Sequence, residues 1–341
     1  MVAVNDRAVV GGIADRTGDT GIRGFVRRRP LLSFFLMANL LSWVAWTPYV
    51  LSATGLGVWD FHFPALLGST QTVGVLPGAY LGPIMAAFVV TLVADGKPGL
   101  RRWVGRMLRW RISWVWYVSI VVAVPFALTS TSLGLSDGAV QMPSVAVLVA
   151  YIPVMIFQML TTGLAEEPGW RDFATPRLQK RYGPIIGMLI LGPMWGVWHL
   201  PLFFSEWGGW PDVTALRVLE FIASCFTLSV VMTWVFNRTK ESLPLVMLLH
   251  VSVNTYFSVA WEEMFPTIAT AENSTHIQLM TTGVAAAIVL IATRGRLGYQ
   301  PAVEPSATQG AAALPATPGV VEPSATPGAT EPPATRDAKV D

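Results

Sequence analysis

The hydrophobic residues of this chain gather into long runs separated by short polar segments. Each run has about the 20 apolar residues that an α-helix needs to cross a lipid bilayer. We therefore predict an all-α, polytopic membrane protein with eight transmembrane helices, at residues 31–51, 73–94, 113–135, 144–166, 184–205, 215–236, 242–261 and 275–293.

The first run, 31–51, follows the basic cluster Arg27, Arg28 and Arg29. A secretory signal has a shorter apolar core of roughly 7–15 residues, so this run is predicted to be a retained helix. In the second run, Gly74, Gly78 and Gly82 recur at a spacing of four, which predicts close helix packing. Pro77 and Pro83 predict that this helix is bent.

The basic residues alternate from one connecting segment to the next. Every Lys and Arg except Arg217 falls in 1–30, 95–112, 167–183, 237–241 or the segment after 293. The connections between them, 52–72, 136–143, 206–214 and 262–274, contain no basic residue. Basic loops stay on the cytoplasmic side. Both termini are therefore predicted to be cytoplasmic, in a multi-pass protein of the cell membrane.

Composition agrees with a protein embedded in the lipid bilayer. Hydrophobic residues make up 52% of the 341 residues and charged residues only 13%, against roughly 25% charged in soluble domains. The net charge of +2 gives no sign of nucleic-acid binding, so no nucleic-acid partner is expected. Cys225 is the single cysteine, which excludes an internal disulfide and a CxxC metal motif.

The C-terminal end differs in kind from the rest of the chain. It is rich in Pro, Ala and Thr, and the hexapeptide VEPSAT occurs twice in it. Such a segment buries too little apolar surface to fold and is predicted to be disordered. The predicted organisation is a cytoplasmic segment at 1–30, a membrane domain at 31–298 with a motif core at 144–260, and a tail at 299–341.

Three polar clusters interrupt the apolar runs. They are Glu166-Glu167-Pro168-Gly169-Trp170-Arg171, Trp195-Gly196-Val197-Trp198-His199 and His250-Val251-Ser252-Val253-Asn254. Ionisable groups within membrane helices are costly and therefore candidates for function. A spacing of four places His250 and Asn254 on one helix face, and likewise Trp195 and His199.

The acidic pair has its own geometry. Adjacent residues diverge by about 100° on a helix, so Glu166 and Glu167 cannot both face one cavity in a regular helix. Glu167 and Arg171 are four apart and can pair, although Pro168 favours a helix end between them. Taken singly, each of these polar residues fits a structural role. Together they form the set of groups that a hydrolase needs, namely a base, a water holder and oxyanion donors.

These residues resemble the motifs of the CPBP intramembrane proteases, which include the Rce1-type CAAX prenyl endopeptidases and the bacterial Abi proteins. Their pattern is EExxxR, FxxxH and HxxxN on separate helices of an eight-helix core. Here EExxxR is Glu166, Glu167 and Arg171, and HxxxN is His250 and Asn254. The second motif has Trp195 where Phe is usual, before His199. The resemblance covers residues 144–260 by motif.

The resemblance implies an endopeptidase that acts on a membrane peptide or a prenylated protein. Glu166 is then the general base, His199 holds the water, and His250 and Asn254 stabilise the oxyanion. Glu167 and Arg171 would shape the site or bind the substrate's carboxylate. The rival mechanism is a catalytic zinc held by Glu166, His199 and His250, a permissible ligand set. The chain has no HExxH motif, and the metal-free mechanism with no cofactor is preferred.

The motif residues differ in predicted depth, and two other functions fit the same residues. The predicted boundaries put Glu166 at the cytoplasmic end of its helix and His199 about 22 Å deep, although the site requires that they converge in a water-filled cavity. A transporter would also place polar groups in the membrane, but the chain has no second copy of these motifs, as paired transporter repeats would. A non-catalytic immunity or scaffold protein is the other alternative.

Overall fold

The computed structural model describes residues 21–66 and 69–301, and those up to Gln300 belong to one compact unit. Almost all of the predicted tail and most of the predicted N-terminal segment lie outside the described residues. Within these ranges the fold is helical and contains no strand. Eight helical spans are long and apolar enough to cross a membrane, which confirms the predicted fold class. The predicted orientation of the termini stays a prediction.

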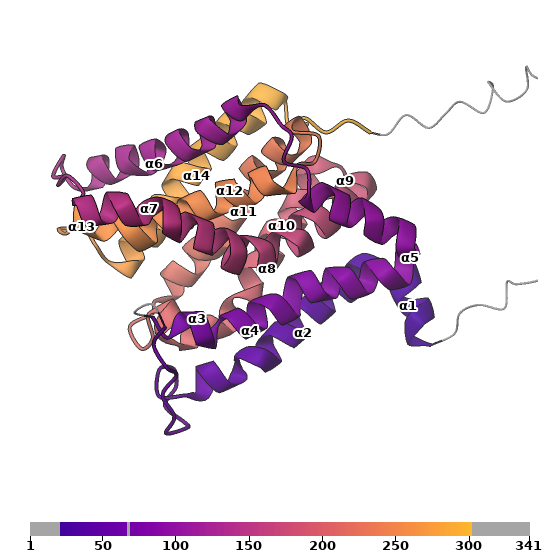
Figure 1. Cartoon of the computed structure of the whole chain (residues 1–341), viewed down its shortest axis with the longest axis horizontal. Helices are drawn as coiled ribbons and strands as arrows, with labels where there is room; N and C mark the ends of the chain where they lie inside the picture. The colour runs from indigo at the N-terminus through magenta and orange to yellow at the C-terminus, as the bar shows by residue number, and fades with distance from the viewer. Residues whose placement is uncertain (1–20, 67–68, 302–341) are drawn as a thin grey trace, which may run out of the picture. The chain divides into compact units, whose positions relative to one another are not determined.

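The eight spans follow one another along the chain (Figure 1). Four of them, the second, fourth, fifth and seventh, consist of several helical segments joined end to end, and π-helical turns occur in three of these four. The helices are α1 (Ile22–Arg28), α2 (Pro30–Leu51), α3 (Gln71–Gly74), α4 (Leu76–Ala79), α5 (Met85–Met107), α6 (Trp114–Leu135), α7 (Val145–Gln158), α8 (Leu164–Glu167), α9 (Thr175–Tyr182), α10 (Pro184–Trp198), α11 (Ala215–Arg238), α12 (Leu243–Thr255), α13 (Glu262–Met264) and α14 (Ala271–Thr293).

The second and fourth spans are longer than the hydropathy pattern predicts. The second runs to Met107 and the fourth to Tyr182, so most of the predicted loops 95–112 and 167–183 is helical. The length of an apolar run indicates only the part of a helix that lies in lipid. Polar residues can continue the same helix beyond the bilayer. The prediction of loops there was therefore wrong.

The glycines of the second span pack closely against α2, as predicted. A Cβ atom on Gly74 would lie 2.1 Å from the Tyr49 ring, and one on Gly78 would lie 2.3 Å from the Trp46 indole. The close approach also allows the Trp46 indole to donate a hydrogen bond of 2.7 Å to the Val75 carbonyl. A π-helical turn at Tyr80–Ile84 contains Pro83, so the helix is irregular at one of the two prolines that were predicted to bend it.

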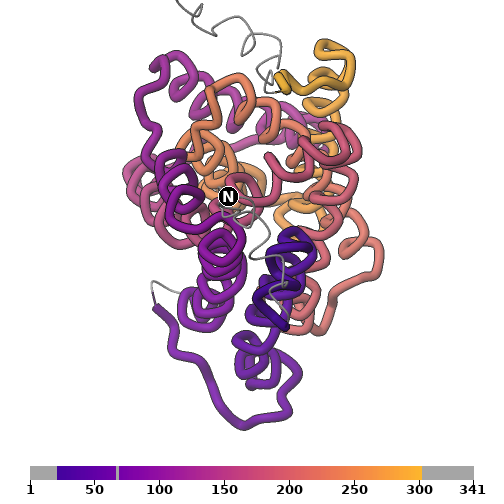
Figure 2. The backbone as a smooth tube through the Cα atoms, turned by 90° about the vertical axis from the view of Figure 1, so that its right-hand side faces the viewer, coloured from indigo at the N-terminus to yellow at the C-terminus, as the bar shows by residue number. Residues whose placement is uncertain are grey.

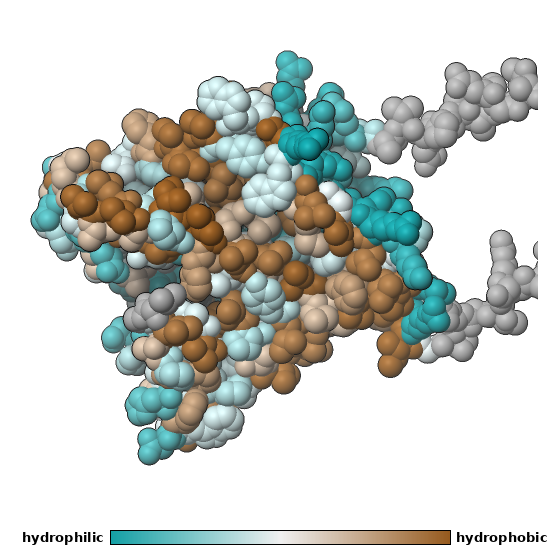
Figure 3. All heavy atoms as spheres, viewed as in Figure 1, coloured by the Kyte–Doolittle hydropathy of each residue, from teal (hydrophilic) through white to brown (hydrophobic). Residues whose placement is uncertain are grey.

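Two views show how the helices are arranged. Helix α2, near the N-terminus, and α14, near the C-terminus, lie on opposite sides of the bundle (Figures 1 and 2). Hydrophobic residues cover most of the face in Figure 3, and hydrophilic ones collect where α1, α5 and α9 end. This end carries the basic residues of α5 and α9. The distribution is that of a bundle with an apolar belt in lipid and a polar end in water.

Candidate active site

The EExxxR segment lies in an irregular part of the fourth span. Helix α8 ends at Glu167 and a π-helical segment, Pro168–Ala174, follows directly and leads into α9. The α-helix thus ends before Pro168, as that residue favours, but the span continues through it as a π-helix instead of ending there. The Pro168 carbonyl accepts a 2.9 Å hydrogen bond from the indole of Trp103 on α5. This contact stabilises the distorted turn from outside the span.

Helix α5 holds the same segment at a second point. Arg106, one turn after Trp103, forms an ion pair with Asp172, whose side chain is fully buried. Its guanidinium also donates to the Asp172 carbonyl at 3.1 Å. In the sequence, Arg106 is one of the basic residues of 95–112 that predict membrane orientation. Nothing in its spacing pointed to this contact, which depends on how α5 packs.

Arg171 and Glu167 form the predicted pair. Arg171 Nε lies 3.5 Å from Glu167 Oε2, and both side chains are fully buried. The guanidinium lies 4.4 Å over the Trp195 ring and donates to Ser229 Oγ at 3.2 Å. Arg171 is thereby fixed between three helical spans. A buried charge requires such partners.

The two glutamates point toward different helices, as their divergence predicts. Glu166 Oε2 accepts a 2.8 Å hydrogen bond from Trp195 Nε1 on α10. Glu167 Oε1 lies 2.7 Å from His250 Nδ1 on α12. The rings of Trp195 and His250 meet edge to face at 5.1 Å. Both carboxylates therefore belong to one cluster, even though each reaches a different partner.

His199 ends α10 within an aromatic enclosure. Its ring stacks on Trp207 at 5.4 Å and meets Trp198, Phe221 and Trp195. Nδ1 lies 2.9 Å from the Trp195 carbonyl. A carbonyl only accepts, so Nδ1 carries the proton and Nε2 is left as an acceptor. The predicted packing of Trp195 on His199 is confirmed.

His250 and Asn254 lie together on one face of α12, as their spacing predicts. Asn254 Nδ2 is 3.4 Å from His250 Nε2. His250 Nδ1 faces the Glu167 carboxylate and must donate to it. The ring is thereby oriented with Nε2 directed toward the amide of Asn254.

The chain geometry removes the difficulty over depth. Gly183, with φ of 80°, forms a tight turn between α9 and α10. Glu166 lies 17 residues before this turn and His199 lies 16 residues after it. Both are therefore about 25 Å from it at 1.5 Å per residue. The fourth span extends well beyond Glu166, which places the glutamate deep within the bundle.

The cluster is nearly closed to solvent, in contrast to the open water-filled cavity that we expected. Glu166, His199 and His250 are 6%, 7% and 5% exposed. The aromatic residues around His199 fill much of the space. In the described ranges, no group of three or more His, Cys, Asp or Glu side chains is placed to hold a metal ion. The predicted zinc set Glu166, His199 and His250 is not among such groups.

Fold and cluster together define a class, a multi-pass helical membrane protein with a buried set of acid, imidazole and amide groups. Residues 148–256 match the model of a family described as Type II CAAX prenyl endopeptidase Rce1-like. The match contains every candidate residue from Glu166 to Asn254. These findings support the resemblance to the CPBP, Rce1-like family that the motifs predicted.

A curated relative supports the same family. CAAX prenyl protease 2 of Methanococcus maripaludis is 26% identical over 140 residues. The matched stretch is 40% of this chain and 49% of that protein. The chain thus spans about half the length of the relative that it matches.

Proposed function

We propose that this protein is an intramembrane endopeptidase that hydrolyses a peptide bond of a membrane-associated substrate. The strongest support is that Trp195 contacts Glu166, His199 and His250 and so brings residues of all three motifs together. The relative's name, CAAX prenyl protease 2, suggests a prenylated C-terminal sequence as the substrate.

In the proposed reaction, Glu166 is the general base. One of its carboxylate oxygens accepts from Trp195, which leaves the other to accept a proton from water. His199 Nε2 accepts the second hydrogen of this water and so fixes its position. The water oxygen attacks the carbonyl carbon as its proton passes to Glu166. Glu166 then returns this proton to the leaving nitrogen as the C–N bond breaks.

His250 and Asn254 stabilise the charge that develops on the substrate's oxygen. In its imidazolium form, His250 donates from Nδ1 to Glu167 and from Nε2 toward the oxyanion. The Asn254 amide is beside Nε2 and supplies a second donor. One such donor typically contributes about 2.7–4 kcal/mol to transition-state stabilisation. Glu167 and Arg171 act as positioning residues, since their burial suits a shaping role better than contact with the substrate's carboxylate.

We further propose that the reaction proceeds without a metal. A catalytic zinc needs ligands within about 2.0–2.2 Å, whereas His199 and His250 are held on different neighbours. Purified, active protein should contain well under one zinc per chain, and chelation should leave activity largely intact. Stoichiometric zinc that is lost in His199→Ala, with activity restored only by added metal, would reverse this proposal.

The experiment that tests the function is a cleavage assay with the whole protein in lipid nanodiscs. A synthetic peptide that ends in a prenylated CAAX sequence is the substrate, and mass spectrometry identifies the products. The proposal expects a single new C-terminus and less cleavage of the same peptide without the lipid. Intact peptide of both kinds after long incubation would contradict the proposed substrate class. Cleavage of neither this peptide nor any membrane peptide would contradict the peptidase itself.

A further inference from the structure

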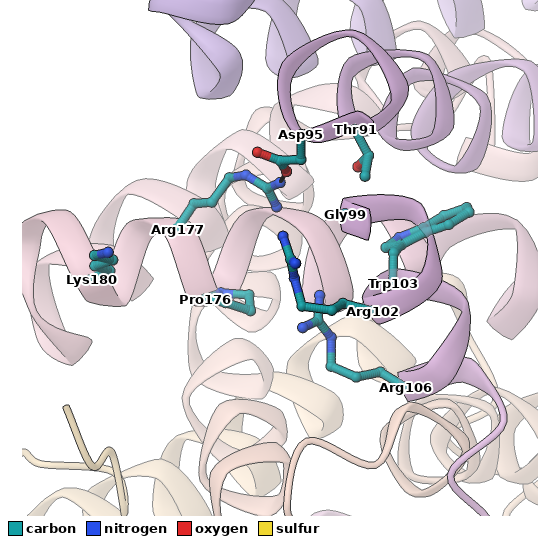
Figure 4. Close-up of a pocket in the computed structure, with 9 residues that line it drawn as sticks. All are labelled: Thr91, Asp95, Gly99, Arg102, Trp103, Arg106, Pro176, Arg177 and Lys180. Carbon is teal, nitrogen blue, oxygen red and sulfur yellow. Dashed lines mark hydrogen bonds and ion pairs between the residues drawn. The ribbon is translucent and has the colours of Figure 1, made fainter. Parts of the chain in front are cut away.

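A cavity of about 240 Å³ lies between α5 and α9, outside the catalytic cluster. Its lining includes Arg102 and Arg106 of α5, four residues apart, and Arg177 and Lys180 of α9, three residues apart. These spacings place each pair on one helix face. Figure 4 shows that the four basic side chains come from two neighbouring helices, with Asp95 opposite Arg177. The cavity is therefore a basic recess between two helices.

The carboxylates at this recess do not neutralise all of its charge. Arg177 forms an ion pair with Asp95, and Arg106 forms ion pairs with both Asp172 and Glu241. Arg102 and Lys180 are exposed and have no hydrogen-bond or ion-pair partner among the residues that the structure describes. Two positive charges thus remain without a counter-charge at one cavity. An anion that accepts several hydrogen bonds would neutralise these charges.

The position of the recess indicates which anions can reach it. Helix α5 is apolar up to Ala94, and its backbone leaves helical geometry at Gly96, where φ is 64°. The recess lies along α5 on both sides of this kink, where apolar residues give way to charged ones. Just along the chain, Trp110 and Trp114 are largely exposed, as aromatic residues at a membrane interface are. The recess therefore lies at the level of lipid headgroups.

We propose that this recess binds an anionic phosphate group, which either a lipid headgroup or a free phosphate can supply. Arginine forks match phosphate oxygens in geometry, and lysine adds a point charge. Basic recesses between membrane helices on the cytoplasmic side are suited to anionic headgroups. The volume is below the roughly 300–1,000 Å³ of pockets for drug-sized ligands, which favours a small polar group. This proposal does not depend on the proposed peptidase activity.

The test measures lipid binding to the full chain by native mass spectrometry from detergent micelles. The probes are phosphatidylglycerol, which is anionic, and phosphatidylcholine, which is not. The test variant is Arg102→Gln with Lys180→Gln. The matched control is Lys97→Gln with Arg101→Gln, which removes the same charge from exposed positions of α5 that do not line the recess.

We expect wild type and control to retain phosphatidylglycerol in preference to phosphatidylcholine. The affinity of the test variant for phosphatidylglycerol should be roughly tenfold lower than that of wild type. Displacement of the lipid by inorganic phosphate in wild type would identify the free ion as a second occupant. A charge-preserving variant, Arg102→Lys with Lys180→Arg, should bind like wild type. If the double Gln variant fails to fold, Lys180→Gln alone should still show weaker binding. The proposal would be overturned if the folded test variant bound phosphatidylglycerol as tightly as the control does and inorganic phosphate did not displace the lipid from wild type.

Discussion

Trp195 Nε1 lies 2.8 Å from Glu166 Oε2, so the indole donates a hydrogen bond to the carboxylate that we propose as the base. The same indole supports the Arg171 guanidinium and the His250 ring. Phe is usual at this position in the CPBP motif, and Phe would keep the packing without the donor. Trp195 therefore links the second motif to the first through a bond that the family pattern does not require.

Replacement of Trp195 by Phe should separate these two roles. Packing against His199 and His250 remains, while Glu166 loses one donor. A net hydrogen bond contributes about 0.5–1.5 kcal/mol, so kcat should fall roughly twofold to tenfold in a peptide-cleavage assay. The kcat of Trp195→Ala should fall further, because this change also removes the packing. Equal activities of Trp195→Ala and wild type would show that the indole does not position Glu166.

We expect the buried Arg171–Glu167 pair to contribute to the stability of the fold. Arg171→Met leaves the Glu167 charge buried, and breaking a buried pair costs about 3–5 kcal/mol. The thermal unfolding midpoint in detergent should therefore drop markedly. The double variant Glu167→Gln with Arg171→Met should recover part of the loss.

Arg177→Met is the control for this pair, because its ion pair with Asp95 is partly exposed. Such pairs contribute about 0–1 kcal/mol, and its midpoint should change little. An Arg171→Met midpoint no lower than that of Arg177→Met would mean that the buried pair does not stabilise the fold.

Asn254→Ala tests the proposed oxyanion donor. Turnover should fall by roughly 10²–10³ because the amide would stabilise charge that develops only in the transition state. The KM should change much less, since ground-state binding does not use this bond. A variant that loses binding while it keeps kcat would assign Asn254 a structural role instead.

Membrane orientation can be read by cysteine labelling of intact cells. In a Cys225→Ser background, cysteines at Ser69 and Asp212 should react with an impermeant maleimide added outside. Gly105→Cys is the matched inner position, because a Cβ there meets no atom within 4 Å. It should react only after permeabilisation. Labelling of Gly105→Cys alone in intact cells would invert the predicted orientation.

Much of the fold could be predicted from apolar runs and i, i+4 spacing, since both are local properties of the chain. The eight spans, the glycine contacts with α2 and the pairing of Glu167 with Arg171 follow from them. The course of the chain through Pro168 could not be predicted, because Trp103 and Arg106 of α5 support that turn from far along the sequence. The bond from Trp195 to Glu166 likewise depends on the tertiary packing of two spans.

In the proposed reaction, Glu166 takes a proton from the attacking water. Glu166→Gln keeps the shape and the acceptor for Trp195 but removes the base. Glu262→Gln makes the same change at an exposed residue of α13, outside the site. Both purified variants are compared with wild type in cleavage of the prenylated peptide. We predict no detectable cleavage by folded Glu166→Gln and wild-type rates for Glu262→Gln. Full activity of Glu166→Gln would contradict the role of Glu166 as the base.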